Sequence, residues 1–156
     1  MSPDRQIHVP TVLLVDDNPV DRVLAVTAFR RAEVPNPIVE IGDGEELMDY
    51  LLRRGRHASR AQHHGPLVIL LDINMPRKTG LEALAEIKAH PELKRIPVVM
   101  LTTSDADRDI AQAYGLGANS FITKPLGFTE FLELVERFAK YWLASVALPR
   151  AQGALR

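Results

Sequence analysis

The chain has 156 residues, of which 46% are hydrophobic and 25% are charged, and its formal net charge is −1. A chain of this length is expected to form one domain that buries about 70% of its unfolded surface, and its near-neutral charge gives no bulk attraction to nucleic acid or an anionic membrane. The absence of cysteine excludes disulfides, thiolate catalysis and cysteine-ligated zinc.

The amino-terminal residues 1–10 are polar and lack the apolar core of a signal peptide. Further along the chain, no apolar run approaches the roughly 20 residues that a membrane-spanning helix needs. We therefore expect a soluble, cytoplasmic protein.

The first half of the chain alternates short apolar runs with helical patterns. Strands are predicted at 12–15 and 38–41, where apolar runs are bounded by turn residues. Asn18 is typical of a helix N-cap, with Pro19 at the first helical position. The helix that follows runs through Val20, Val23 and Leu24 to about Ala32. A second helix follows the turn at 42–44 and includes Leu47, Tyr50 and Leu51.

The second half continues this alternation after a polar loop at 55–66. Strands are predicted at 67–71, 97–101 and 119–122, and helices around 81–87, through Ile110 and Ala113, and from Phe128 to Trp142, before Pro149. Ser104 and Asp107 resemble a capping box at the start of the fourth helix. Five strands that alternate with five helices predict one α/β domain with a parallel sheet, because each crossover between parallel strands needs a helix.

Polar side chains follow four of the five predicted strands at the point where each strand ends. They are Asp16 and Asp17 after the first, Asp72 after the third, Thr102 at the fourth and Lys124 after the fifth. Because ligands of open parallel sheets bind outside the carboxyl ends of the strands, we expect these side chains to gather on one rim. Asp72 directly follows five apolar residues, where an unpaired charge is costly.

This set of side chains favours phosphoryl transfer assisted by a divalent cation. Three clustered carboxylates repel each other unless a cation lies among them. Oxygen ligands favour Mg²⁺, and the histidine that a transition metal prefers is absent near these strand ends. Mg²⁺, a lysine and a hydroxyl suit the oxygens of a phosphoryl group. An aspartate can be the nucleophile, which predicts an aspartyl-phosphate.

The same motifs resemble those of the receiver domain of two-component response regulators. They are Asp16-Asp17 after an apolar strand, Leu71-Asp72-Ile73-Asn74-Met75-Pro76 with Gly80, Leu101-Thr102, and Lys124-Pro125. The resemblance covers residues 11–144 and implies a flavodoxin-like, doubly wound sheet of five parallel strands in the order 2-1-3-4-5 with five helices. It leaves 1–10 and 145–156 as terminal tails, without an output domain.

The resemblance also implies how the acidic residues act. Asp72 would accept a phosphoryl group from a phosphohistidine of a sensor histidine kinase. Asp17, Asp72 and the backbone carbonyl of Asn74 would bind Mg²⁺ directly, and Asp16 would act mainly through a bound water. The side chain of Asn74 would tune the lifetime of the phosphoryl group.

The remaining residues of the rim are implied to sense the phosphoryl group. Lys124, with a cis bond to Pro125, would pair with the phosphoryl oxygens. Thr102 would move inward to donate a hydrogen bond to the phosphate, and Phe121 would follow as the aromatic switch. Thr103 and Ser104 would also tune the phosphoryl lifetime, with the bulk of Thr103 restricting access.

A narrower resemblance points to the small regulators that are paired with phytochrome histidine kinases. It is carried by His90-Pro91-Glu92-Leu93, Ile96-Pro97-Val98-Val99, Leu101-Thr102-Thr103-Ser104, Tyr141-Trp142-Leu143 and the polar insertion at 55–66. This resemblance favours a homodimer, with Leu134, Phe138, Tyr141 and Trp142 as its candidate surface.

The expected function is a stand-alone switch that catalyses only its own Mg²⁺-dependent phosphorylation and dephosphorylation. Its output would pass through the fourth helix, fifth strand and fifth helix to another protein, without direct contact to nucleic acid or a membrane.

A phosphatase of the haloacid-dehalogenase type would instead carry Asp-x-Asp on the first strand, where this chain has adjacent acids. A binding module that is not phosphorylated would not need the complete Asp, Thr and Lys set. The loop residues His57, His63 and His64 lack the spacing of a metal site and are interpreted as solvated.

Overall fold

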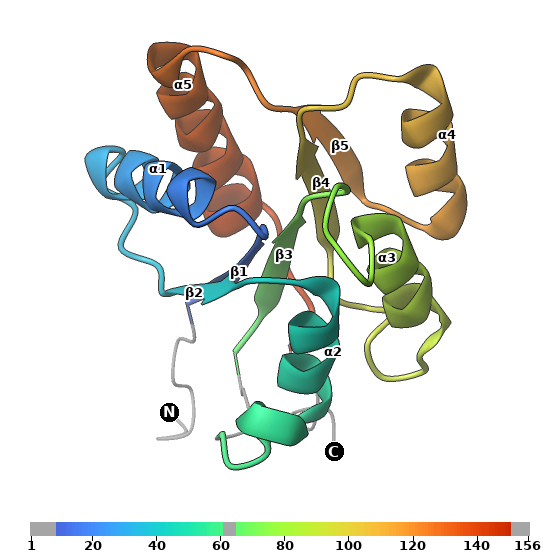
Figure 1. The fold of residues 1–156 in the computed structure, drawn as a ribbon. Helices are drawn as coiled ribbons and strands as arrows, with labels where there is room; N and C mark the ends of the chain where they lie inside the picture. The colour runs from blue at the N-terminus through green and yellow to red at the C-terminus, as the bar shows by residue number, and fades with distance from the viewer. Residues whose placement is uncertain (1–8, 61–64, 151–156) are drawn as a thin grey trace, which may run out of the picture.

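Five short apolar segments form one parallel sheet in the computed structural model, which describes residues 9–60 and 65–150. The strands are β1 (Thr11–Val15), β2 (Ile38–Ile41), β3 (Leu67–Leu71), β4 (Val98–Thr102) and β5 (Ser120–Thr123). Their order across the sheet is β2-β1-β3-β4-β5, which confirms the predicted doubly wound topology (Figure 1). Residues 1–8 and 151–156 of the two expected tails and residues 61–64 of the polar loop lie outside the described residues.

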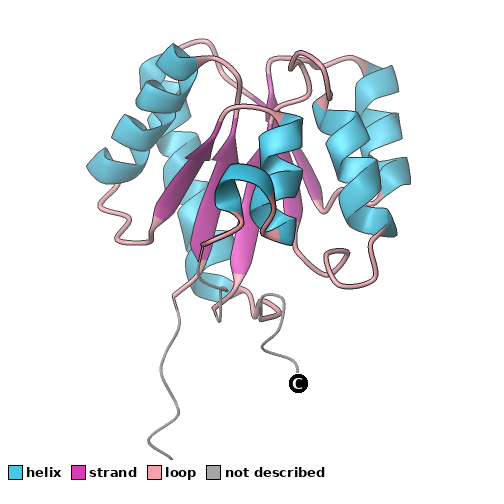
Figure 2. Cartoon of the chain, turned by 60° about the horizontal axis from the view of Figure 1, so that its bottom comes forward, coloured by secondary structure: helices cyan, strands magenta, loops and turns pink. Residues whose placement is uncertain are grey.

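Within the described ranges, five α-helices cover both faces of the sheet, as the sequence predicts. They are α1 (Pro19–Arg31), α2 (Gly44–Leu52), α3 (Gly80–Ala89), α4 (Asp107–Leu116) and α5 (Phe128–Phe138). Helices α1 and α5 lie on one face, and α2, α3 and α4 lie on the other (Figure 1 and Figure 2). A 3₁₀ turn, η1 (Gly55–His57), follows α2. None of the helices in residues 9–60 and 65–150 has the length and apolar character needed to cross a membrane.

The central strands β1, β3 and β4 are buried on both faces, which is why their sequences are apolar without alternation. Successive side chains point to opposite faces of a strand and therefore enter separate cores. Leu13 and Ile69 pack with residues of α2, α3 and α4, whereas Leu14 and Leu70 pack with residues of α1 and α5. These two cores hold the strand ends in place, and with them the polar side chains that follow.

The helix starts confirm one predicted cap and correct another. The Asn18 side chain caps α1 by accepting hydrogen bonds from two backbone N–H groups of the first turn, at 2.9 and 3.3 Å. Ser104 does not cap α4, because the backbone between Ser104 and Asp107 is not helical and Ala106 occupies the cap position. The Ser104 hydroxyl instead donates to Asp109 Oδ2 at 2.6 Å.

Helix α1 turns three apolar residues of its first half toward solvent. The exposed fractions of Val20, Val23 and Leu24 are 64%, 62% and 47%. The buried side of α1 carries Ala28 and Phe29 instead. The predicted helix is therefore correct, but part of its apolar pattern belongs to the surface and not to the core.

The last helix ends earlier than its apolar pattern predicts. The α-helix α5 ends at Phe138. A π-helical segment, η2 (Ala139–Ser145), follows it directly and ends before Pro149. Arg150 then forms an isolated antiparallel bridge with Pro66, so the chain returns to the start of β3.

Candidate functional site

Three aspartates meet where β1 and β3 end. Asp16 and Asp17 follow β1, Asp72 follows β3, and one carboxylate oxygen of each lies within 4.8 Å of the others. The register accounts for this, because β1 and β3 are neighbours in which Val15 pairs with Leu71, so that the next residues emerge side by side. The Asp72 N–H donates to the Val15 carbonyl at 3.0 Å and holds the two strand ends together. The structure thus brings the three predicted acids into one group.

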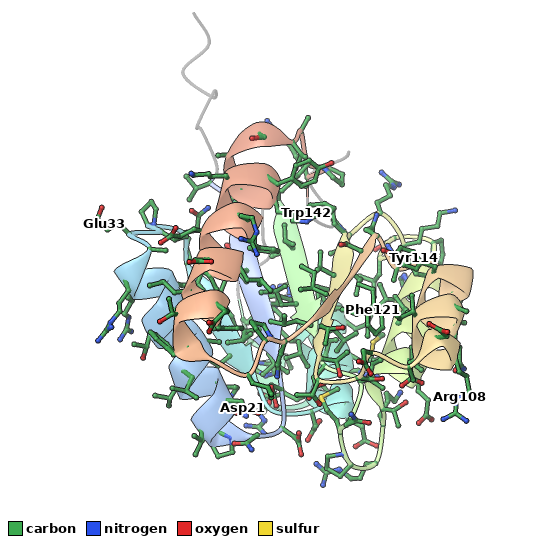
Figure 3. The ribbon with its side chains drawn as sticks, turned by 90° about the horizontal axis from the view of Figure 1, so that it is seen from above. Asp21, Glu33, Arg108, Tyr114, Phe121 and Trp142 are labelled. Atoms are coloured by element: carbon green, nitrogen blue, oxygen red, sulfur yellow. The ribbon has the colours of Figure 1, made fainter. Side chains whose placement is uncertain are left out.

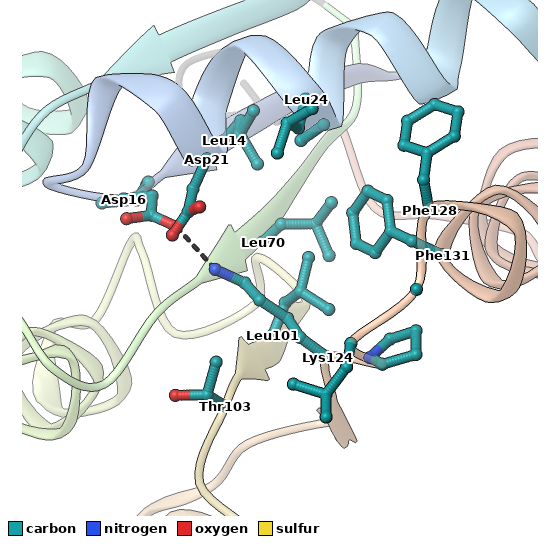
Figure 4. Close-up of a pocket in the computed structure, with 15 residues that line it drawn as sticks. Leu14, Asp16, Asp21, Leu24, Leu70, Leu101, Thr103, Lys124, Phe128 and Phe131 are labelled. Carbon is teal, nitrogen blue, oxygen red and sulfur yellow. Dashed lines mark hydrogen bonds and ion pairs between the residues drawn. The ribbon is translucent and has the colours of Figure 1, made fainter.

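Lys124 reaches this acidic group from the end of β5. Its Nζ donates to Asp16 Oδ2 at 2.6 Å, and the two side chains are only 14% and 6% exposed (Figure 4). Its backbone N–H donates to the Thr102 carbonyl at 2.7 Å. The bond between Lys124 and Pro125 is trans, which corrects the cis bond that the resemblance implies. Trans is the form that bonds before proline favour, by about 0.5–1 kcal/mol.

The surroundings of Asp72 disfavour its negative charge. The residue is 9% exposed, and its Oδ1 oxygen accepts no hydrogen bond from the part of the chain that the structure describes. Burial raises the pKa of Asp72, and the Thr102 hydroxyl and the Lys124 ammonium only partly offset this effect. A buried carboxylate oxygen without a donor is a position that a cation can satisfy.

The available donors fit a hard divalent cation such as Mg²⁺. The group offers carboxylate oxygens, and such cations bind through oxygen. Asp16 already uses both of its carboxylate oxygens, because Oδ2 accepts from Lys124 and Oδ1 accepts from the Asn18 N–H at 2.9 Å. Asp17 is exposed, and Asp72 Oδ1 has no hydrogen-bond partner among the described residues, so these two side chains have oxygens left for a cation.

The loop between β3 and α3 folds tightly behind Asp72. The Gly80 N–H donates to the Ile73 carbonyl at 2.9 Å, and a Cβ atom on Gly80 would lie 1.9 Å from the Asp72 carbonyl oxygen. Only glycine fits there, which explains why Gly80 belongs to the sequence motif. Asn74 is exposed on the same loop.

The two predicted switch residues point to the same face of the sheet. Thr102 ends β4 and is fully buried, and its Oγ1 accepts a long hydrogen bond of 3.5 Å from the Ser104 N–H. Phe121 on β5 pairs with Met100, two residues before Thr102, so Phe121 and Thr102 share a face. Phe121 is half-buried against the core on the α4 side of the sheet (Figure 3).

Thr103 and Ser104, the residues expected to tune the site together with Asn74, have different surroundings. Thr103 is exposed and lines a cavity beside Lys124. Ser104 is held by its neighbours, since its hydroxyl donates to Asp109 and its carbonyl accepts from the Thr123 hydroxyl at 3.2 Å. The Ser104 side chain is therefore engaged with α4.

The candidate dimer residues differ in exposure. Tyr141 is 56% exposed, whereas Leu134 and Trp142 are half-buried against the core between α1, α5 and the sheet (Figure 3). Phe138 is only 5% exposed, and its ring packs edge-on against Phe29 with the ring centres 5.9 Å apart. Phe138 is a core residue of the single chain, which corrects its assignment to a dimer surface.

Of the three loop histidines, His57 lies within the described residues. Its Nε2 lies 3.0 Å from Glu46 Oε2, and its ring packs edge-on against Tyr50. His57 therefore joins the turn η1 to α2. His63 and His64 lie outside the described residues.

A cavity beside the acidic group was missed by the sequence predictions. It has a volume of about 220 Å³ and lies between α1 and the connection from β5 to α5 (Figure 4). Its lining is mostly apolar, with Asp16, Asp21 and Lys124 at its polar side and Leu14, Leu24, Leu70, Leu101, Phe128 and Phe131 among its walls. Leu126, which also lines it, is fully exposed. A leucine directly after Lys124-Pro125, in a loop, is the sequence signal that could have indicated this cavity.

Known proteins share this fold and sequence. Residues 12–136 match the family model of the response regulator receiver domain. The response regulator Rcp1 from Synechocystis sp. is 36% identical over 140 residues, which cover 90% of this chain and 93% of Rcp1. The structure of the phosphorylated cyanobacterial phytochrome response regulator RcpA is 40% identical, with a TM-score of 0.81, over 91% of this chain and 99% of that chain. The Mn(2+)-bound form of Rcp1 is 35% identical, with a TM-score of 0.78, over 89% and 98% of the two chains.

The match to the receiver family includes every strand end that carries a polar side chain. The similar phytochrome regulators are covered over nearly their whole length. The strand order and the group of three aspartates beside a lysine agree with both findings. The chain therefore belongs to the response regulator receiver family, in the type associated with phytochromes, and has a role in two-component signalling.

Proposed function

We propose that the protein is a phosphorylation switch in which Asp72 accepts a phosphoryl group from a phosphohistidine of a sensor histidine kinase. The observation that carries this proposal is the buried Asp72 carboxylate in a group of three acids next to Lys124, because its Oδ1 accepts no hydrogen bond from residues 9–60 and 65–150. Such a carboxylate is poorly stabilised until it binds a cation or a proton. A metal-assisted nucleophile needs an oxygen that is free in this way.

In the transfer step, a carboxylate oxygen of Asp72 forms a bond to phosphorus. The bond between phosphorus and the donor imidazole nitrogen breaks, and its electron pair stays on that nitrogen. Asp17, Asp72 and the Asn74 carbonyl would hold Mg²⁺, with Asp16 acting through a water. When bound, Mg²⁺ offsets charge on the phosphoryl oxygens. Attack of water on phosphorus later breaks the bond to Asp72 and releases phosphate, so that the protein dephosphorylates itself.

The conformational switch is proposed to use Lys124, Thr102 and Phe121, which respond to the new phosphoryl group. Lys124 exchanges its ion pair with Asp16 for a phosphoryl oxygen. The Thr102 hydroxyl turns to donate to another phosphoryl oxygen, and Phe121 moves into the space on the same face of the sheet. Asn74, Thr103 and Ser104 then set how readily water reaches the phosphorus. The result is a changed surface over α4, β5 and α5.

The kinase is proposed to approach over α1. Val20, Val23 and Leu24 are apolar and exposed, and Leu126 lies exposed by the cavity that Asp16 and Lys124 border. Exposed apolar side chains that gather next to a polar site favour contact with another protein. The similarity to the phytochrome response regulators Rcp1 and RcpA supports a phytochrome kinase as this partner.

A homodimer is also proposed, through the exposed Tyr141 and the half-buried Trp142 of η2 together with the half-buried Leu134 of α5. Trp142 lies far from Asp21 in Figure 3. Sedimentation at micromolar concentration checks it, with and without phosphorylation. A monomer in both states would contradict the proposal. In the dimer, Tyr141→Glu is expected to weaken association, because it places a charge in the apolar contact.

The test of the main proposal is direct phosphorylation. The protein is incubated with Mg²⁺ and a small acyl-phosphate donor, and intact mass and base lability identify an acyl phosphate. Wild-type protein is expected to carry one phosphoryl group, which Asp72→Asn removes. Absence of label on the wild type, or undiminished label on Asp72→Asn, would contradict the proposal. Transfer from an autophosphorylated phytochrome kinase then tests the partner.

A further inference from the structure

We infer that Arg22 and Arg77 are positioning residues for the two loops that carry the acidic group. Both arginines form ion pairs with acidic residues of β2 and of the turn after it. This edge strand supplies no polar side chain to the rim. The inference rests on the proposed metal site and assigns a task to residues outside it.

Arg22 holds the loop after β1. Its Nη1 donates to the Asp16 carbonyl at 2.5 Å, and its Nε lies 3.5 Å from Glu40 Oε1 on β2. The Asp16 N–H donates to the Ile41 carbonyl at 3.1 Å, so β2 and Arg22 together bind both backbone groups of Asp16. Because a peptide unit is planar, fixing the Asp16 carbonyl also fixes the N–H of Asp17 and the direction in which Asp17 leaves the strand.

Arg77 holds the loop after β3. Its φ angle is 64°, a left-handed conformation that residues with a Cβ atom disfavour, so contacts have to maintain it. Its Nη2 lies 2.5 Å from Asp43 Oδ2, and Asp43 is itself fixed as the cap of α2 by accepting from the Glu46 N–H at 2.7 Å. The Arg77 side chain is 65% exposed, and exposed ion pairs add little stability, which favours a role in geometry.

The backbone of the β3–α3 loop also approaches α2 closely. A Cβ atom on Gly44 would lie 2.8 Å from the Lys78 carbonyl oxygen, next to Arg77 in the chain. The loop that begins with Asp72 and includes Asn74 is therefore held at α2 as well as at Gly80. A shift at Arg77 would be transmitted over only three residues to the Asn74 carbonyl.

The charges of these contacts fit a task beside a cation site. Each arginine is paired with an acid, Arg22 with Glu40 and Arg77 with Asp43, so neither brings an unpaired positive charge to the rim. Two unpaired arginines would compete with Mg²⁺ for the three aspartates. Pairing lets them orient the loops while the aspartates stay available.

The experiment compares Arg22→Gln, Arg77→Gln and Asp43→Asn with the control Arg54→Gln. Asparagine caps helices as well as aspartate, so Asp43→Asn removes the charge and keeps the cap. Arg54 pairs with Asp49 at 2.8 Å at the other end of α2, with side chains 55% and 35% exposed. Three quantities are measured: the Kd for Mg²⁺ by calorimetry, amide hydrogen exchange of residues 73–79 without metal, and the Tm.

Arg77→Gln and Asp43→Asn are expected to weaken Mg²⁺ binding by about tenfold, as outer contacts of metal sites do, and to speed exchange in residues 73–79. Their double variant should be no weaker than either single variant, because both remove the same contact. Arg22→Gln should weaken Mg²⁺ binding without faster exchange at 73–79. Arg77→Lys should restore part of the affinity, and the Tm values should stay close to that of Arg54→Gln.

Two outcomes separate the failures. If wild-type protein binds Mg²⁺ while all three variants match Arg54→Gln in affinity and exchange, the inference is wrong and the proposed function stands. If wild-type protein binds no Mg²⁺, the proposed metal site is wrong, and the inference falls with it.

Discussion

Asp72 is buried and Lys88 is half-buried, and the two regions differ in whether they give the charged side chain hydrogen-bond partners. The Lys88 ammonium donates to the carbonyls of Lys94 (3.1 Å) and Ile96 (2.8 Å) and to Asn119 Oδ1 (3.1 Å). Asp72 Oδ1 has no partner in the described part of the chain. Burial lowers the pKa of Lys88 and raises that of Asp72, so both are shifted toward neutrality.

The difference separates structural from functional burial. The three donors of Lys88 are all used, and they tie α3 to the loops before β4 and β5. This charge is expected to stabilise the fold and to have no part in phosphorylation. Asp72 differs on both counts. Its negative charge lowers the stability of the fold, and its unpaired oxygen is what a phosphoryl acceptor requires.

The largest expected effect is the complete loss of phosphorylation in Asp72→Asn. The same change should raise the Tm of metal-free protein at neutral pH. The sign follows from the raised pKa, because the folded state binds the proton more tightly than the unfolded state, and the associated stability is lost as pH rises above the ordinary value of 3.8. Intact mass and thermal unfolding measure the two effects, with the exposed Asp105→Asn as control. A Tm below that of wild type would contradict the contrast with Lys88.

Lys124→Met tests the ammonium group that is paired with the Asp16 carboxylate. The change leaves Asp16 buried without the ammonium at 2.6 Å, which should lower the free energy of unfolding by about 2–4 kcal/mol. Urea unfolding measures it, with the exposed Lys140→Met as control. Because a divalent cation can take over the role of the ammonium, Mg²⁺ should stabilise Lys124→Met more than wild type. Equal stabilisation would mean that Lys124 and the metal do not share the acidic group.

Lys88→Met should reduce stability and leave phosphorylation intact. The change removes the donor from two carbonyl groups and from Asn119, and acceptors left unpaired cost about 1–3 kcal/mol in total. Urea unfolding and the rate of labelling by an acyl-phosphate donor are measured together. Lys94→Met, an exposed lysine on the neighbouring loop, is the control. A labelling rate that falls with stability would place Lys88 among the functional residues.

The same two regions show how far the sequence could predict the structure. The rim was predictable, because a buried parallel strand is an apolar run and its end is marked by the first polar residue, as at Asp72 and Thr102. The network of Lys88 was not, since its acceptor Asn119 lies 31 residues further along the chain. No local pattern indicates which carbonyls such a side chain will reach.

Helix faces were the other limit of prediction. The apolar spacing of 128–142 indicates a helix, but packing in the core that Phe29 shares decides that Phe138 is buried while Tyr141 is exposed. Likewise, Val20 and Val23 are apolar but lie on the surface, because α1 packs through the face that carries Ala25, Ala28 and Phe29. Side-chain type restricts where a residue can lie, and the tertiary contacts select among the remaining places.

The smallest expected effect is at Asp43, an acid near the rim whose two carboxylate oxygens both accept hydrogen bonds. Burial alone would raise its pKa, but the hydrogen bond from Glu46 N–H and the contact with Arg77 lower it below the ordinary value of 3.8. A lowered pKa gives stability that is present above pH 3.8 and lost as pH falls through the folded-state value, the opposite sign to Asp72. Asp43→Asn should therefore cost less than about 1 kcal/mol at pH 7 and lose less stability than wild type between pH 5 and pH 3. Urea unfolding across that range measures it. If the two proteins lose stability in parallel, the neighbours of Asp43 do not stabilise its carboxylate. The number of hydrogen-bond and ionic partners would then not explain why the pKa values of Asp43 and Asp72 shift in opposite directions.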